Sequence, residues 1–361
     1  MACHGGVKQA SGLSLIYREQ AISETDSGGV AIVPGDAEAS VLLERVAEDD
    51  PDFRMPPGDH GEALTDAEVA TLRQWIDEGA KWERHWAFAP PQPTTPPFVE
   101  FEGWPRAMLD RFVLARLESE GLAPNKEADR ATWLRRVSFD VTGLPPAPDD
   151  YDAFLADDSK DAYERVVDRL LASPHYGERW TAMWLDLARY ADTQGYEKDP
   201  HRDVWPYRDW LIRAFNQDMP YDEFTIKQLA GDLLPGAGID DRLATAMHRN
   251  TQTNTEGGTD DEEFRIAAVL DRVSTTWQVW QATTFRCAQC HAHPYDPIRH
   301  EEFYQFLAVL NTSQDVDVSE DFPLLAVPKD VDNWSRADEI DRRVTELRQE
   351  IFQQSSELVD S

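Results

Sequence analysis

The sequence predicts a mostly α-helical chain of several domains, and three observations support this fold class. Apolar residues recur at three- and four-residue spacing through much of the chain, and no run shows the alternation of a strand. A proline-rich stretch over residues 86–105 separates two regions that each show helical periods. The length of 361 residues and the hydrophobic content of 41% are sufficient for a core in each of two or three domains.

Residues 1–85 are expected to form a small helical domain. A proline-glycine turn precedes a short helix predicted over residues 36–46. The sequence TDAE at residues 65–68 is typical of a capping box, which begins a helix that Gly79 closes. Two prolines directly after Met55 keep this methionine on an extended loop.

Beyond the linker at residues 86–105, which we expect to be extended, residues 106–312 are predicted to form a larger helical domain. Its helices are expected at residues 107–119, 175–190, from about 221 to 231, 261–283 and 300–310. Residues 313–361 are expected to be a linker and an amphipathic helix. Over residues 334–358 this helix could pair as a coiled coil or contact a further C-terminal domain, through Ala337, Ile340, Val344, Leu347, Ile351 and Leu358.

The charge of the chain bears on its partners. Lys and Arg number 35 and Asp and Glu number 68, which gives a formal charge of −33. This charge opposes binding to phosphate backbones and to anionic lipid, so nucleic acid is not an expected partner. No stretch approaches the roughly 18 consecutive apolar residues of a membrane span, and no signal peptide is recognisable in the sequence as given.

Cys287, Cys290 and His291 form a C-x-x-C-H motif. Two thiols at this spacing can add to the vinyl groups of a haem, whose iron the adjoining imidazole then ligates. A zinc knuckle shares the cysteine pair but needs a second pair of ligands, and the only other cysteine is Cys3. A thioredoxin-like pair lacks the adjacent histidine. The motif therefore predicts covalent haem c, with zinc and redox thiols as alternatives.

Cys3 and His4 match the last two positions of another such motif, whose first cysteine would precede Met1. Met55 lies further along on its loop, where a small c-type cytochrome would present its second axial ligand. Ligation by methionine and histidine raises a haem potential. Cys3, His4 and Met55 are therefore predicted to bind a first haem. The alternatives are a chance Cys-His pair and a methionine that fills a core.

The ligand opposite His291 is predicted to be His248, which ends a helical stretch. The other candidates are His175, Met183, Met247, His293 and His300, of which His293 is too close to His291 in the sequence to reach the opposite face of the haem. A histidine with a structural role is the alternative for His248. An open or water-bound iron is the alternative for the haem, and it would favour chemistry on a substrate over simple electron transfer.

Polar residues gather in two further stretches, residues 192–202 and 253–261. Glycines beside carboxylates make loops that could hold calcium through oxygen ligands or present acid and base groups to a substrate. Asp192 and Glu256 are the candidate catalytic residues. Solvated acidic loops are the alternative in a chain with so many carboxylates.

These stretches resemble the domains of Planctomycete cytochrome c proteins. Residues 1–82 resemble the first-type cytochrome c domain, on IVPGD at residues 32–36, MPP at 55–57 and LTDAE at 64–68. Residues 107–311 resemble the second-type domain, once called a domain of unknown function, on GLPP at 143–146, HYGERW at 175–180, LARYAD at 187–192, HRNT at 248–251 and the stretch 287–297. The resemblance implies haem-dependent electron handling outside the cytoplasm.

The chain departs from this family pattern at both ends. The first haem cysteine and an export signal are missing at the start, and the chain stops within a helical segment, so we expect a fragment truncated at both ends. The predicted function is extracytoplasmic, for example periplasmic, electron transfer with a redox protein of unknown identity. The alternatives are a haem-dependent oxidative enzyme acting on an unknown substrate at the second domain, and a structural module in which haem or zinc replaces core.

Overall fold

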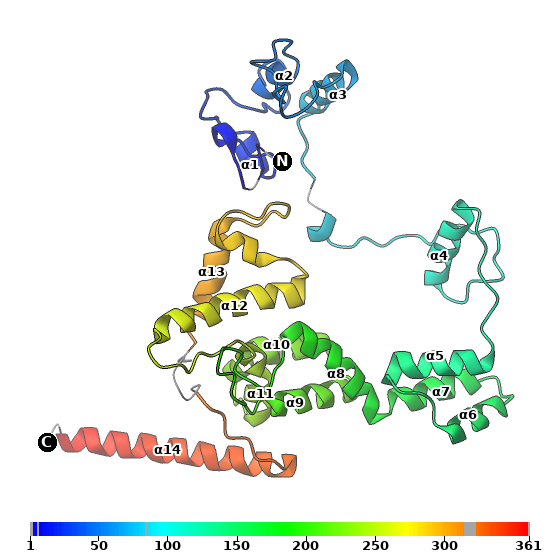
Figure 1. Cartoon of the computed structure of the whole chain (residues 1–361), viewed down its shortest axis with the longest axis vertical. Coiled ribbons are helices and arrows are strands. Elements are labelled where there is room, and N and C mark those ends of the chain that lie inside the picture. The colour runs from blue at the N-terminus through cyan, green and yellow to red at the C-terminus, as the bar shows by residue number, and fades with distance from the viewer. Residues whose placement is uncertain (1–2, 6, 84–85, 314–322, 360–361) are drawn as a thin grey trace. The chain divides into compact units, whose positions relative to one another are not determined.

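The computed structural model confirms a mostly helical chain (Figure 1). It describes residues 3–5, 7–83, 86–313 and 323–359, with side chains up to residue 354. Within these residues there are fourteen α-helices and no β-strand, and none of the helices is long and apolar enough to cross a membrane. The chain divides into two compact units. Unit 1 comprises Met1–Pro96 with Ala282–Val309, and unit 2 comprises Pro97–Gln281 with Leu310–Ser361.

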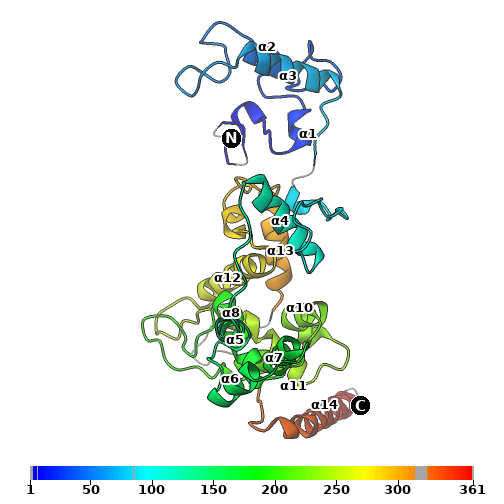
Figure 2. The same ribbon diagram turned by 90° about the vertical axis from the view of Figure 1, so that its right-hand side faces the viewer.

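The N-terminal part of unit 1 contains α1 (Arg18–Ala21), α2 (Val41–Val46) and α3 (Asp66–Asp77). Figure 2 shows α2 and α3, in blue, close together, and they share a small core built from Ala21, Ile32, Ala37, Leu43, Ile76 and Ala80. The predicted capping box of α3 is confirmed. The Thr65 hydroxyl accepts the N–H of Glu68, and the Glu68 carboxylate accepts the N–H of Thr65 at 2.7 Å.

The helix predicted over residues 36–46 is shorter than expected, because α2 begins only at Val41. Ser40 explains the difference. Its hydroxyl donates to the carbonyl of Asp36 at 2.8 Å and accepts the N–H of Val33 at 2.9 Å. These local bonds hold the backbone before Val41 in a turn instead of a helix.

The second part of unit 1 contains a 3₁₀ helix at Phe285–Gln289 and then α13 (His300–Leu310), as predicted. Phe285 and Phe303 are buried, and their rings stack with centroids 5.3 Å apart. Ile298, in the loop between the two helices, is also buried. The C-x-x-C-H motif therefore lies on a short loop that α13 supports from one side.

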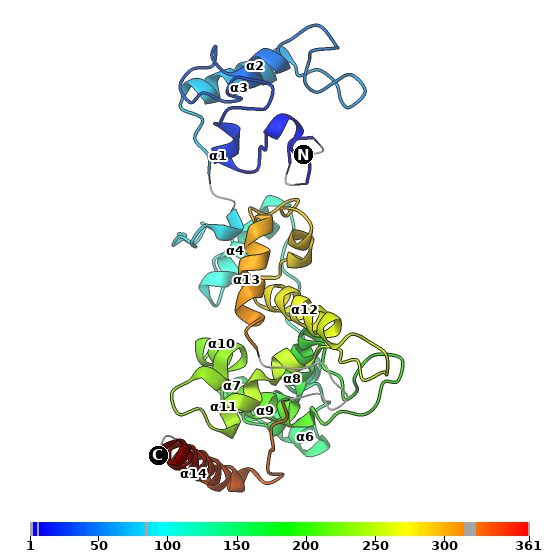
Figure 3. The same cartoon turned by 90° about the vertical axis from the view of Figure 1, so that its left-hand side faces the viewer.

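Unit 2 is a set of packed helices, several of which are seen in Figure 3. They are α4 (Met108–Ser119), α5 (Arg130–Thr142), α6 (Pro148–Leu155), α7 (Ala162–Leu171), α8 (Pro174–Ala188), α9 (Trp205–Asn216), α10 (Tyr221–Ala230), α11 (Ile239–Ala244), α12 (Asp261–Gln281) and α14 (Trp334–Val359). The helices α8 to α11 enclose the main core, in which Tyr207, Trp210 and Leu211 are almost completely buried.

Two helices of unit 2 end earlier than predicted, for the same reason. The prediction extended α8 to residue 190 and α12 to residue 283, but the helices end at Ala188 and Gln281. Arg189 and Ala282 adopt left-handed backbone conformations, with φ of 56° and 51°. A left-handed residue ends a helix, and no glycine marks either position in the sequence.

The C-terminal helix α14 joins the core only at its first turns. Trp334 is buried, and Ala337 packs against the same core cluster. Further along, the apolar stripe is open to solvent, and Leu347 and Ile351 are 40% and 65% exposed. The side chain of Leu358 lies outside the described residues. The coiled-coil partner of this helix thus stays a prediction.

Candidate haem sites

The C-x-x-C-H loop holds its residues at different depths. Phe285 and Ala288 are buried, so one side of the 3₁₀ helix is fixed in the core beneath α13. Cys287 is half-buried and Cys290 is exposed, and both are free thiols. The residues around the thiols therefore anchor the loop and leave the sulfur atoms accessible for reaction.

Side chains of α13 fix two of the three peptide groups between the cysteines. Nδ1 of His300 lies 2.8 Å from the carbonyl oxygen of Ala288, and the Tyr304 hydroxyl donates to the carbonyl oxygen of Gln289 at 2.9 Å. Both carbonyls belong to the x-x positions of the motif. His300 is thereby committed to the loop backbone, which gives it a structural role.

His291 is oriented as a metal-ligating histidine is. Its Nδ1 lies 2.8 Å from the carbonyl oxygen of Ala292, to which an Nδ1–H donates. In that tautomer Nε2 carries the lone pair, and histidine ligands of metals commonly donate their other N–H to a carbonyl in this way. Two accessible thiols and an imidazole with its Nε2 available fit a covalently attached haem c.

His293, two positions further, is arranged differently. Its side chain is buried, and Nδ1 accepts the backbone N–H groups of Asp296 at 2.9 Å and Tyr295 at 3.3 Å. The ring thus closes the turn that follows the motif.

The N-terminal candidates lie in the same unit. The carbonyl oxygens of Cys3 and His4 accept the N–H groups of Ala10 and Leu15 at 2.8 and 2.9 Å, which fixes their backbone. Cys3 is a half-buried free thiol, and the Nδ1 atom of His4 is buried without a hydrogen-bond partner. A buried nitrogen without a partner costs free energy, which a bound group could offset. The pair therefore fits attachment of a haem at this end too.

Met55 occupies a loop, as predicted. Its backbone N–H donates to the carbonyl of Arg45 at 2.8 Å, and its side chain is 38% exposed. The thioether sulfur is thus accessible for ligation of a metal. Met55 belongs to unit 1 with Cys3 and His4, and its ligation of an iron stays a prediction.

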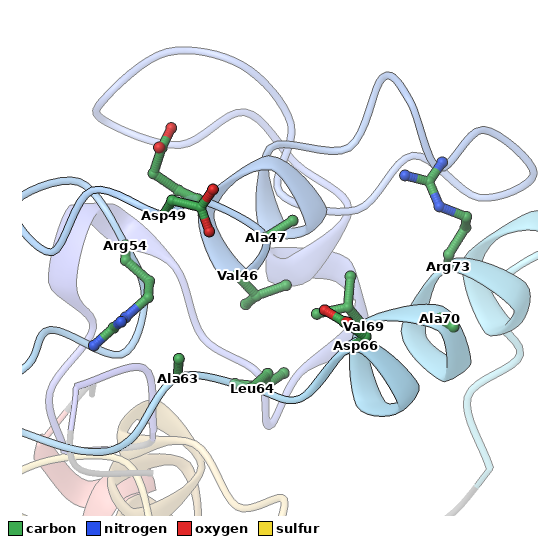
Figure 4. Close-up of a pocket in the computed structure, with 11 residues that line it drawn as sticks. Val46, Ala47, Asp49, Arg54, Ala63, Leu64, Asp66, Val69, Ala70 and Arg73 are labelled. Carbon is green, nitrogen blue, oxygen red and sulfur yellow. The ribbon is translucent and has the colours of Figure 1, made fainter.

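A pocket of about 330 Å³ opens near α2 and α3 (Figure 4). Apolar side chains and two arginines line it together with acidic residues, and the lining comprises Val46, Ala47, Glu48, Asp49, Arg54, Ala63, Leu64, Asp66, Val69, Ala70 and Arg73. The three predicted ligands of the first haem do not belong to this lining. The pocket is therefore a feature that the sequence did not indicate, and it does not unite the predicted ligands.

Two family models match the chain. The model of PSCyt2, described as "Protein of unknown function (DUF1549)", matches residues 108–315, which is more than half of the chain. The chain belongs to the PSCyt2 family. The model of PSCyt1, described as "Planctomycete cytochrome C", matches residues 1–59, in the predicted order. No curated protein and no solved structure shows significant similarity to the chain.

The PSCyt1 match bears on the cofactor. A Planctomycete cytochrome c domain implies covalently bound haem c, and the match places this implication on residues 1–59. Cytochrome c domains of this kind are typically extracytoplasmic. The PSCyt2 family, by its description, adds no activity to this assignment.

His248 lies in the PSCyt2 region, on a 3₁₀ helix at Thr245–Arg249, next to the buried Met247. This segment belongs to unit 2, whereas the C-x-x-C-H motif, also within the PSCyt2 match, belongs to unit 1. His248 is thus in a different unit from His291. Its role as an iron ligand stays a prediction.

The two polar loops of the PSCyt2 region do meet. The backbone N–H of Lys198 donates to the Glu256 carboxylate at 3.3 Å, and the N–H of Thr253 donates to the carbonyl of Gln194 at 3.1 Å. Asp192 lies at the start of the first loop, where its carboxylate accepts the Tyr190 hydroxyl at 2.6 Å. Burial and this hydrogen bond raise the pKa of Tyr190, so its hydroxyl remains a donor.

Asn250 is a residue that sequence reasoning missed. It precedes the second polar loop, is only 7% exposed, and neither its amide nitrogen nor its amide oxygen has a hydrogen-bond partner. Its place in the HRNT stretch was the one available signal. Among the residues that the structure describes, no group of three or more His, Cys, Asp or Glu side chains is arranged to hold a metal ion. Calcium at these loops stays a prediction.

Proposed function

We propose that the chain is an extracytoplasmic electron-transfer protein whose haem c is attached at Cys287 and Cys290. The observation that carries this proposal is the orientation of His291, whose Nδ1 faces a carbonyl and whose Nε2 is left for iron. The bound haem would supply a one-electron redox centre. A redox protein of unknown identity would be its partner.

The chain's own residues support such a centre in two ways. The stacked rings of Phe285 and Phe303 exclude water from one side of the loop. His300 and Tyr304 hold the loop backbone, so the thiols and the imidazole keep fixed positions while the charge on the site changes. A rigid, partly dry site reduces the rearrangement that accompanies electron transfer, and burial and axial ligation set the potential.

The direct test is a pyridine haemochrome spectrum with iron-to-protein stoichiometry, on chain exported through a cytochrome c maturation pathway. We expect Cys287→Ala/Cys290→Ala to carry one covalent haem fewer than the unaltered chain. Arg286→Ala is the matched control, because it changes an exposed side chain beside the motif and keeps all three thiols. If the unaltered chain carries no haem, the proposal fails, and zinc analysis of the same sample tests the alternative metal.

We also propose Cys3, His4 and Met55 as the attachment and axial residues of a first haem. The free thiol of Cys3, directly before His4 in the sequence, supports this assignment. Occupancy of the site is measured as the covalent haem that remains in Cys287→Ala/Cys290→Ala. This haem should be lost when Cys3→Ala is combined with that double variant.

An oxidative enzyme is the second candidate, and Asn250 favours it. A buried amide with two unused hydrogen-bonding atoms, beside loops that carry Asp192 and Glu256, is typical of a ligand site. Cyanide binding distinguishes the candidates. A haem with protein ligands on both faces resists added cyanide, and this result would support electron transfer. An open iron binds cyanide, and this result would support the oxidative enzyme.

A further inference from the structure

A buried hydrogen bond joins the two segments of unit 1. Tyr17, directly before α1, is 7% exposed, and its hydroxyl donates to the carbonyl oxygen of Ile298 at 3.0 Å. The two residues are 281 positions apart in the sequence. Ile298 is buried as well and follows the C-x-x-C-H motif by a few residues. The segment that matches Planctomycete cytochrome C thus touches the loop that carries the second motif.

The same carbonyl closes that loop. Besides the Tyr17 hydroxyl, the carbonyl oxygen of Ile298 accepts the backbone N–H of His293 at 2.8 Å. The His293 ring then accepts the N–H of Asp296 at 2.9 Å. A short chain of hydrogen bonds therefore runs from Tyr17 to a residue two positions from His291. Because these groups are buried, loss of the Tyr17 hydroxyl removes one of the two hydrogen bonds that the Ile298 carbonyl accepts and weakens the closure of the loop.

Arg299 adds a second link between the segments. Its guanidinium lies over the Tyr17 ring, 5.5 Å from the centroid, and pairs with the carboxylate of Glu19. Both charged side chains are about half exposed, so the ion pair contributes little free energy and serves mainly to orient the ring. Burial and the nearby charge of Glu302 raise the pKa of the Tyr17 hydroxyl, which remains a donor.

We propose that Tyr17 is a positioning residue for the second haem motif, through which the cytochrome c segment sets the reduction potential at His291. This inference rests on the proposed function. Holding the loop closed keeps water away from the proximal histidine, and a drier surrounding favours the reduced, less charged iron. A site whose loop is loosened has a lower potential.

The test compares Tyr17→Phe with Tyr295→Phe in the full chain. Tyr295 belongs to the same loop, but its side chain is 76% exposed. Potentiometric titration of the haem-loaded chain and amide hydrogen exchange of residues 292–299 in the haem-free chain are the two readouts. Tyr17→Phe should lower the potential and speed exchange about fivefold, as loss of a typical hydrogen bond does. Tyr295→Phe should change neither.

The outcomes separate this inference from the proposed function. A chain without covalent haem overturns the electron-transfer proposal, while hydrogen exchange still tests the link made by Tyr17. If Tyr17→Phe changes neither the potential of the haem-loaded chain nor the exchange of the haem-free chain, the inference is overturned and electron transfer is left standing. Arg299→Gln, which keeps the Tyr17 hydroxyl, should shift both readouts in the same direction by less, and it carries the test if Tyr17→Phe does not fold.

Discussion

Two histidines that stand two positions apart have opposite roles. His291 presents Nε2 for a metal, whereas the His293 ring accepts two N–H groups within the turn. His291→Ala should keep the haem attached through its thioethers and change the absorption spectrum to that of a haem without its histidine ligand. His293→Ala should keep the spectrum and lower stability by about 1 kcal/mol. Spectra that changed in His293→Ala alone would reverse this assignment.

Asp157 gives the molecule a defined response to acid. Its carboxylate accepts the hydroxyl of Ser159 at 2.6 Å and the N–H of the same residue at 3.0 Å, and it pairs with Arg165. These bonds lower the pKa of Asp157 from 3.8 to about 2. Since the pKa is lower in the folded state, the contribution to stability is complete above pH 3.8 and is lost as the pH falls toward 2.

Thermal unfolding at several pH values tests this response. Asp157→Asn should unfold at a lower temperature than the unaltered chain at neutral pH, and the difference should vanish near pH 2. The adjacent Asp158 is exposed, so Asp158→Asn is the matched control and should follow the unaltered chain throughout. A difference that persists undiminished near pH 2 would contradict the prediction.

Among the helices, the packing of α8 on α9 depends on a glycine. A Cβ at Gly177 would lie 2.5 Å from the carbonyl oxygen of Ile212 and 2.7 Å from the side chain of Asn216. Gly177→Ala should therefore force the helices apart and destabilise unit 2 by about 1–3 kcal/mol in denaturant unfolding. Gly257 has open space around it, and Gly257→Ala should leave the midpoint unchanged. A neutral Gly177→Ala would show that α9 can move away without cost.

The open stripe of α14 predicts self-association. A charge on an apolar contact is costly, so Leu347→Asp/Ile351→Asp should abolish coiled-coil pairing. Gln349→Asp/Gln353→Asp adds the same charge at the same spacing, off the stripe, and should preserve pairing. Sedimentation equilibrium measures the molecular mass of each variant and of the unaltered chain. A monomeric unaltered chain would instead favour a contact with another domain.

The helices show which features of the fold could be predicted from the sequence. The capping box at Thr65 and the bounds of α13 followed from local spacing and residue type. The early end of α8 did not, because Arg189 adopts a left-handed conformation that its residue type does not announce. Likewise, the C-x-x-C-H motif identified its own residues, but the support from His300 and Tyr304 depends on how α13 folds back on the loop.

At the scale of the whole chain, the most distant contacts were the least predictable. The sequence divides the chain into consecutive stretches, 1–85, 86–105, 106–312 and 313–361, and these boundaries stay a prediction. The compact units are discontinuous, since Ala282–Val309 groups with Met1–Pro96. The hydrogen bond from Tyr17 to Ile298 is part of this grouping. Neither periodicity nor a motif indicates such a pairing, because each describes only neighbours along the chain.

The charge of −33 has a kinetic consequence for electron transfer. The negative charge of the chain repels small anions and attracts small cations over about 10 Å at 0.1 M salt, and added salt screens both effects. Oxidation of the reduced haem by hexaammineruthenium(III), a cation, should therefore slow as salt rises, and oxidation by hexacyanoferrate(III), an anion, should accelerate. Stopped-flow absorbance measures both rates. Opposite salt slopes would show that the negative field reaches the haem, where it would favour a redox partner with a basic surface. Equal slopes would mean that the field at the exposed Cys290 does not follow the net charge.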